Sequence, residues 1–247
     1  MKIGIIGDYN PESPTHQATT MALAHSAAKA NLAVETEWLP TASIAGKSDE
    51  WLNSYHGLWI APGVPDSVDG VLHAITFARE HDVPLLGTCA GFQFIIMEFA
   101  RNVLGMTDVH HEEYNSGANH FLISKLSCSL AGQEGQVLIK QQSAVHRIYQ
   151  SEQTIEAFRC SYGLDASYAA RLNEAGLCIV GSDLFGEPRI VELPSHRFFI
   201  GTLYVPQLHS ACDQPHCLVD SFMLHAATRQ VGWAYVPDNM SDGSVYS

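Results

Sequence analysis

The sequence predicts an α/β fold with an open, mostly parallel central sheet, helices on both faces, and extra short antiparallel strands in the second half. Three observations predict it. Apolar runs alternate with helix-like segments up to Gly105, short alternating strands follow from Asn119, and 247 residues of 46% hydrophobic composition can bury one sizeable core. We therefore expect a single domain over residues 1–236 and a polar tail over 237–247.

The first half reads as strands joined by helices. Lys2 to Gly7 is a short apolar run typical of a central parallel strand. Ser13 and Pro14 suit the start of a helix that continues through an alanine-rich run to Ala30. Further strands are expected at 34–38, 57–61 and 83–88, and helices at 71–80 and 91–104, where Gly105 supplies the stop. Ligands of such sheets bind at the carboxyl ends of the strands.

The second half is richer in short strands. They are expected at 120–124, 136–140, 155–161, 177–182, 189–193 and 198–204, with helices at 168–174 and 217–230.

Charge and cysteine content restrict the partners and the compartment. Thirteen basic against 26 acidic residues give a net charge of −13, which disfavours nucleic acid and anionic membranes. A small molecule or a protein, including a second copy of this chain, fits better. The N-terminal apolar run is too short for a signal peptide, and no stretch approaches the ~20 apolar residues of a membrane span. The cysteines lack the dense spacing of a disulfide scaffold, so we expect reduced thiols in a cytoplasmic protein. They are Cys89, Cys128, Cys160, Cys178, Cys212 and Cys217.

The run Gly87-Thr88-Cys89-Ala90-Gly91 follows a buried strand and opens a helix. Glycines two residues before and after a cysteine allow the close backbone approach of a nucleophile elbow. The helix start favours thiolate over thiol, so Cys89 is the candidate nucleophile.

This run, continued through Gln93 and by Met97 to Gly105, resembles the class I glutamine amidotransferases, closest to the C-terminal glutaminase domain of CTP synthase. Similar stretches occur over nearly the whole chain, among them Asp108 to Tyr114 and His196 to Gly201. The resemblance implies a flavodoxin-like fold.

It also implies residue roles. Cys89 would attack a glutamine side-chain amide, and the backbone N–H of Ala90 would belong to the oxyanion hole. Gly63, Gln93 and Glu113 would be substrate-binding positions.

Several positions depart from the family pattern. Val205 stands at the position of the catalytic histidine, and Gln207 at that of the glutamate. The oxyanion loop is shortened and contains Pro65, which has no N–H, and Ser161 replaces a substrate-binding arginine. Losing triad partners typically costs factors of ~10³ or more, so glutamine hydrolysis by the family route is not expected.

Other histidines are candidates for a substitute base. His111 and His209 come first, ahead of His110 and His16, although each also fits an ordinary loop histidine. A zinc site would need ligands from the cluster His209, Cys212, His216 and Cys217, whose spacing matches no paired-ligand pattern. We expect neither a metal nor a cofactor.

Three functions remain open. The first is a divergent cysteine-dependent enzyme acting on a small amino-acid-like or amide substrate. The second is a non-catalytic pseudo-glutaminase that binds a metabolite or a partner, and the third, least favoured, is a true glutaminase. The sequence has no Gly-Lys-Ser/Thr phosphate loop, so a complete CTP synthase is not expected. The chain would act alone or serve a separate synthetase or other protein.

Overall fold

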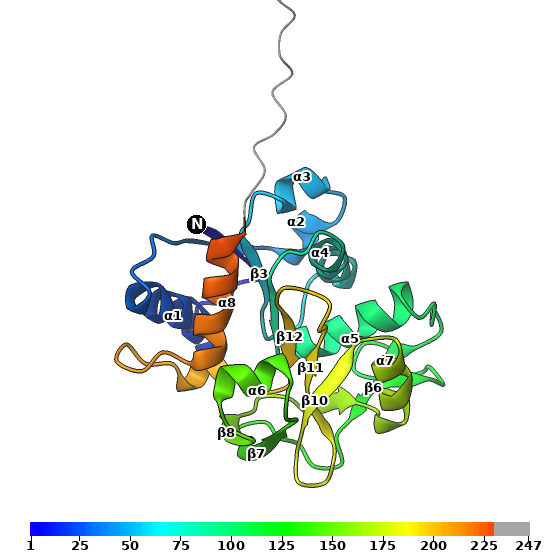
Figure 1. Ribbon diagram of the computed structural model, residues 1–247. Helices are drawn as coiled ribbons and strands as arrows, with labels where there is room; N and C mark the ends of the chain where they lie inside the picture. Colours follow the sequence, from blue (N-terminus) through cyan, green and yellow to red (C-terminus); the bar gives the residue numbers. More distant parts are fainter. Residues whose placement is uncertain (230–247) are drawn as a thin grey trace, which may run out of the picture.

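Nine strands form one sheet in the order β2-β1-β3-β4-β12-β11-β10-β7-β8, and three more form a small sheet, β5-β6-β9. The computed structural model describes residues 1–229 (Figure 1). The strands are β1 (Lys2–Ile6), β2 (Glu35–Leu39), β3 (Gly57–Ile60), β4 (Leu85–Thr88), β5 (His110–His111), β6 (Phe121–Lys125), β7 (Glu134–Ile139), β8 (Gln153–Ala157), β9 (Tyr162–Leu164), β10 (Cys178–Ser182), β11 (Pro188–Glu192) and β12 (Phe199–Thr202). The helices are α1 (Pro14–Lys29), α2 (Thr41–Ile44), α3 (Asp49–Leu52), α4 (Val68–Glu80), α5 (Ala90–Asn102), α6 (Ala144–Tyr149), α7 (Ala169–Glu174) and α8 (Cys217–Thr228), with short 3₁₀ turns η1 (Ala166–Tyr168) and η2 (Pro206–His209).

Strand β12 is the seam of the main sheet, that is, the strand at which its parallel half meets its antiparallel half. It pairs in parallel with β4, where Thr202 lies opposite Thr88, and antiparallel with β11 on its other side. The strands from β2 to β12 are parallel, and those from β11 to β8 are antiparallel. The residues that follow β4 and β12 therefore leave the sheet side by side at the same edge.

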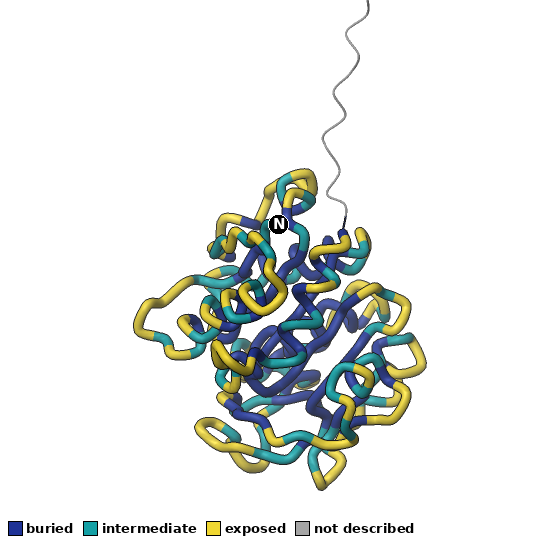
Figure 2. Tube along the Cα trace, turned by 60° about the vertical axis from the view of Figure 1, so that its left-hand side comes forward, coloured by how far each residue is buried: buried dark blue, intermediate teal, exposed yellow. Residues whose placement is uncertain are grey.

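Helices cover both faces of the parallel half. Helices α1 and α8 lie on one side and α4 and α5 on the other (Figure 1). Phe222 of α8 packs edge-on against Trp59 of β3, with ring centroids 6.1 Å apart. Helix α5 is the most deeply placed helix, because every residue from Ala90 to Ala100 is buried. Figure 2 shows this buried centre, with most of the exposed residues toward the outside of the molecule.

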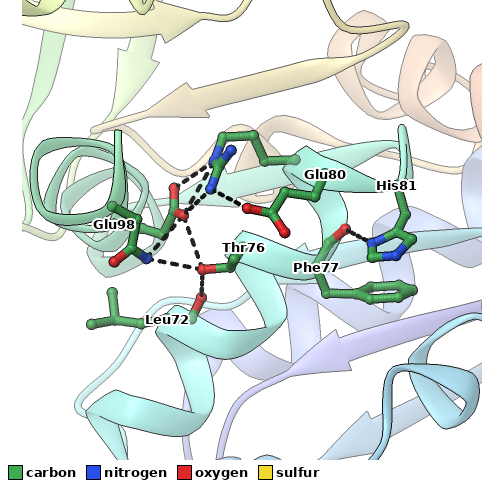
Figure 3. A network of polar contacts seen from close by, with 8 residues as sticks. Leu72, Thr76, Phe77, Glu80, His81 and Glu98 are labelled. Carbon is green, nitrogen blue, oxygen red and sulfur yellow. Dashed lines mark hydrogen bonds and ion pairs between the residues drawn. The ribbon is translucent and has the colours of Figure 1, made fainter. Parts of the chain in front are cut away.

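A buried ion pair joins α4 to α5. The Glu98 carboxylate, which has no solvent exposure, accepts hydrogen bonds from Arg79 Nε and Nη2 at 2.9–3.2 Å. Thr76 Oγ1 donates to the same carboxylate at 2.9 Å and Asn102 Nδ2 at 3.2 Å (Figure 3). Oε1 accepts from all of these donors and Oε2 from Arg79 Nε, so the charge is compensated inside the protein. The contacts fix the angle at which α5 leaves the sheet.

The predicted fold class is confirmed, and most predicted strands and helices appear within a few residues of their expected bounds. Several elements differ from these expectations. Helix α4 begins at Val68, earlier than expected, because Ser67 Oγ caps it by accepting from the N–H of Gly70. The strand expected at 155–161 ends at Ala157, after which the chain turns toward β6. The short helices α2, α3 and α6 were not predicted. The predicted end of the last helix at 230, the domain end at 236 and the tail at 237–247 lie outside the described residues.

Over residues 1–229, no helix combines the length and the apolar character that crossing a membrane requires.

Candidate active site

The candidate nucleophile lies where β4 turns into α5. Cys89 is the residue before the first helical one, with φ of 54° and ψ of −106°, a backbone conformation that side-chain-bearing residues rarely adopt. Its N–H donates to Thr202 O at 2.8 Å, which ties the turn to β12. A Cβ built on Gly91 would lie 2.4 Å from Ile60 O, so only glycine allows α5 to approach β3 this closely. The predicted elbow geometry is present.

The sulfur of Cys89 is bonded to that of Cys160. The two Cα atoms are 5.9 Å apart, within the range that a disulfide spans, and the residues are 71 positions apart in sequence. The expectation of six reduced thiols is therefore wrong for these two cysteines. The error arose because spacing along the chain says nothing about which loops the fold brings together. The other four, Cys128, Cys178, Cys212 and Cys217, are free.

The short loop after β3 approaches the same edge of the sheet. Gly63 has φ of 114°, and His16 of α1 holds the loop by donating from Nε2 to Pro62 O at 2.8 Å. His16 Nδ1 accepts from the N–H of Asn10 at 3.0 Å, which makes Nε2 the protonated nitrogen. The loop, the end of β1 and Phe94 of α5 line a cavity of about 240 Å³. With both ring nitrogens engaged, His16 positions the loop and has no free lone pair to act as a base.

Gln93, His111 and Glu113 do lie together. Gln93 Nε2 donates to Tyr162 O at 2.9 Å, and its Oε1 accepts from His111 Nε2 at 3.0 Å. His111 Nδ1 accepts from the N–H of Glu113 at 3.2 Å. The Glu113 side chain is exposed, and partial desolvation raises the pKa of its carboxyl group. The Gln93 side chain of α5 thus links His111 of β5 to Tyr162 of β9.

Burial determines the charge of His111. The ring is 4% exposed and packs among Phe94, Tyr114 and Tyr162. Burial lowers its pKa from 6.5 to about 4, because no carboxylate stabilises the imidazolium form. His111 is therefore neutral at neutral pH, and its only lone pair is occupied by the Glu113 N–H.

Val205 follows β12 and is completely buried. Its N–H donates to Ala157 O at 2.8 Å, and Pro206 begins the 3₁₀ turn η2 directly after it. An isopropyl group has no proton to give or take, so this position contributes packing alone.

Gln207 is 2% exposed and reaches under the elbow. Its Nε2 donates to Thr19 Oγ1 at 3.1 Å and to Thr88 Oγ1 at 3.3 Å, while its Oε1 is buried without a partner among the described residues. The Thr19 hydroxyl already gives its own hydrogen to Thr15 O at 2.8 Å. It therefore offers only a lone pair, which suits an amide N–H and not a carboxylate.

His209 belongs to a different cluster. Its Nε2 lies 3.1 Å from a Glu134 oxygen and its Nδ1 3.6 Å from Glu156 Oε2. Glu156 is 1% exposed, and its other oxygen accepts from Tyr149 OH at 2.9 Å and lies 3.2 Å from His216 Nε2. His209 is thus turned toward carboxylates of the antiparallel half. Cys212 is exposed, and within residues 1–229 no three His, Cys, Asp or Glu side chains are placed to hold a metal ion.

A larger cavity, of about 720 Å³, lies elsewhere. Helices α6 and α8 and strands β10 to β12 border it, and its lining includes Glu192 but neither Cys89 nor Gln93. Both Glu192 oxygens are used as acceptors for the first N–H groups of α6, at 3.1 Å. Size does not make this cavity the reactive site, because the elbow and its neighbours lie outside it.

Cys160 is the site residue that sequence reasoning missed. It lies in the segment between β8 and β9, directly before Ser161, the position that the family resemblance gives to a substrate-binding arginine. A second cysteine in a segment directed at the nucleophile was the signal that could have found it.

A family model described as glutamine amidotransferase class-I matches residues 15–199. This chain belongs to that family. The CTP synthase of Methanopyrus kandleri is 30% identical over 87% of this chain and 43% of its own length. That of Sulfolobus acidocaldarius is 30% identical over 90% of this chain and 44% of its own length. This amidotransferase chain spans less than half the length of these curated relatives.

Solved structures agree with the sequence relatives. The glutaminase domain of the Trypanosoma brucei CTP synthase, solved with bound acivicin, superposes with a TM-score of 0.85 at 25% identity, covering 94% of this chain and 96% of that one. A glutamine amidotransferase of Thermotoga maritima shares the fold, with a TM-score of 0.59 at 9% identity, covering 92% of this chain and 98% of that one. The resemblance to the glutaminase domain of CTP synthase is confirmed.

Proposed function

We propose that this amidotransferase chain is a divergent cysteine-dependent enzyme, in which Cys89 attacks a small amino-acid-like or amide substrate. The observation that carries the proposal is the backbone of Cys89, with φ of 54° and ψ of −106°. A conformation of this kind costs on the order of 1–3 kcal/mol and persists where it aims a side chain at a ligand. A packing cysteine has no need of it.

The start of α5 supports a nucleophilic thiolate. The first N–H groups of a helix have no partner within the helix, and they stabilise negative charge at the N-terminus. Ala90 is the first residue of α5, so its N–H is placed to stabilise charge on the sulfur or on an oxyanion. Gly63, in the loop after β3, would supply the second backbone element. Reduction of the bond to Cys160 must precede any such attack.

The substrate end would be held by Gln93 and Glu113. The exposed Glu113 carboxylate suits an ammonium group, and the carbonyl oxygen of Gln93 faces the same region when His111 releases it. Gln93 and Glu113 would thus recognise the amino-acid part of the substrate.

The leaving group is the limiting part of the chemistry. Expelling ammonia needs a proton donor, and Val205 at the expected histidine position supplies none. His111 fits the role poorly because its lone pair is occupied and its pKa is about 4. His209 fits poorly because Glu134 and Glu156 engage both ring nitrogens. We infer a substrate whose leaving group departs without a proton from the protein.

A chloroketone analogue of glutamine tests the proposal, because chloride leaves without a proton. The reduced chain is expected to form an adduct on Cys89 at neutral pH, detected by mass spectrometry, and an excess of glutamine should slow it. The exposed free thiol of Cys128 is the matched control, since its labelling should be insensitive to glutamine. Absence of the Cys89 adduct while Cys128 reacts would refute a reactive nucleophile.

Binding without chemistry is the second candidate, favoured by the buried Val205 and Gln207. The chain would then bind a metabolite, or associate with a separate synthetase or another protein, as the CTP synthase relatives suggest. Thermal stabilisation by glutamine that is equal in the reduced wild type and in Cys89→Ser, without any adduct, would favour this candidate.

A further inference from the structure

We propose that Cys89 and Cys160 are a reversible thiol pair: a small hydroperoxide oxidises Cys89, and Cys160 resolves the product as a disulfide that closes the site. The inference rests on the proposed function in one respect, the nucleophilicity of Cys89.

The two sulfurs are delivered by separately anchored parts of the fold. Cys89 is held by its N–H bond to Thr202 O and by α5. On the other side, Cys160 O accepts from the N–H of Leu130 at 3.2 Å, and Ser161 O accepts from the N–H of Leu126 at 2.9 Å. Backbone hydrogen bonds thus hold Cys160 near Cys89 whether or not the sulfurs are joined. The reaction between them is intramolecular and preorganised.

The two cysteines have different environments that assign their roles. Cys89 lies at the N-terminus of a 13-residue helix, which favours its thiolate. Cys160 lies in an irregular segment and has no such helix. Cys89 is therefore the thiol that attacks the oxidant, and Cys160 is the thiol that attacks Cys89.

Accessibility limits the oxidant to a small molecule. Cys89 is 7% exposed and Cys160 3%. A small oxidant or a small dithiol such as dithiothreitol can enter so narrow an opening, whereas a bulky protein disulfide is obstructed there. The reacting oxygen of a hydroperoxide is about as small as a water molecule, so it can reach the sulfur.

The chemistry balances in two steps. The Cys89 thiolate attacks one peroxide oxygen, an S–O bond forms as the O–O bond breaks, and with one proton the products are the sulfenic acid and water or an alcohol. The Cys160 thiol then attacks the sulfenic sulfur, the S–S bond forms, and the hydroxyl group leaves as a second water with the thiol proton. The two thiols lose two electrons and the peroxide gains them.

The disulfide and a covalent substrate adduct exclude each other. The bond uses the sulfur that would attack, and the same segment supplies Tyr162 O, which engages the Gln93 amide. Oxidation therefore occupies the nucleophile and holds the segment against a substrate-binding side chain at once. In the cytoplasm, where we expect this chain, disulfides are usually transient, catalytic or redox-sensing.

The test begins with the full chain, reduced by dithiothreitol, freed of reductant and treated with one equivalent of hydrogen peroxide. Non-reducing peptide mapping should find Cys89 joined to Cys160, and dithiothreitol should reverse the bond without denaturant. Cys160→Ala should accumulate a sulfenic acid on Cys89, trapped by dimedone. Cys89→Ser should leave Cys160 reduced, and Cys128→Ser should behave as the wild type.

Chloroketone labelling then links the bond to the site. Labelling of Cys89 should fall in proportion to the cross-linked fraction and return on reduction, whereas the Cys160→Ala variant should show no disulfide and no dithiothreitol-reversible protection. Failure of peroxide to form the bond, or a bond that resists dithiothreitol in the folded chain, would overturn the proposal. Bond formation without any chloroketone adduct on the reduced chain would refute the proposed enzyme but leave the thiol pair standing.

Discussion

Reducing the Cys89–Cys160 bond is expected to lower the free energy of unfolding substantially. The bond closes a loop of 71 residues, for which the chain-entropy relation gives about 15 cal/mol/K, or about 4 kcal/mol at 25 °C. A chain of this size loses about 2–4 °C of Tm per kcal/mol, so Tm should fall by about 8–16 °C. The native state changes little on reduction, because backbone hydrogen bonds hold Cys160 independently of its sulfur.

Urea unfolding followed by tryptophan fluorescence measures the difference between the oxidised and reduced wild type. Cys160→Ala should resemble the reduced wild type, and dithiothreitol should change it by less than about 1 kcal/mol. Cys128→Ser, which removes an exposed free thiol, should keep the full difference. If dithiothreitol destabilises Cys160→Ala as much as the wild type, or if the two wild-type forms unfold alike, the cross-link does not restrain the unfolded chain.

Three further outcomes follow from the site. The double variant Val205→His with Gln207→Glu should release ammonia from glutamine when reduced, on the order of 10³-fold faster than the wild type. Gln207→Glu alone should lower the free energy of unfolding by about 1–3 kcal/mol, because Thr19 Oγ1 has no hydrogen to donate to the new carboxylate. An ammonia assay showing no gain in a folded double variant would contradict the assigned positions. The unfolded-state pKa of His111 is near 6.5 and its folded pKa about 4, so its contribution to stability is complete above about pH 6.5 and is lost as the pH falls toward 4. His111→Gln should therefore reduce the pH dependence of unfolding between pH 6.5 and 4, by up to about 1.4 kcal/mol per pH unit, and an unchanged slope would refute the buried neutral ring. Gly91→Ala places a methyl group 2.4 Å from a backbone oxygen, so it should cost about 1–3 kcal/mol and slow chloroketone labelling, and a stable, fully reactive variant would contradict the close approach of α5.

Local patterns predicted the parallel half of the fold well. The apolar runs of β1, β3 and β4, the Ser13 cap of α1 and the glycines around Cys89 act over a few residues, so they can be read directly from the sequence. Helix α6 has a local cap, since Ser143 Oγ accepts from the N–H of His146, but it spans only six residues, and its first N–H groups also donate to Glu192, 48 residues further along.

The same limit explains what was missed at the site. The elbow, Gln93 and Glu113 came from a contiguous motif and a family resemblance. The partner of Cys89 is set by a contact between segments 71 residues apart, and the low pKa of His111 by rings from α5 and β9. Neither the pairing nor the burial leaves a periodic signal in the sequence.

The seam at β12 has a consequence for how such a site changes over evolutionary time. Cys89 follows β4, whereas Val205 and Gln207 follow the neighbouring strand β12, which ends at Thr202. Substitutions at these two positions can therefore remove proton-transfer groups while the backbone of the Cys89 turn stays tied to β12 through Thr202 O. A fold of this kind can lose the side chains that one reaction needs and still keep a cysteine sulfur available for a different reaction.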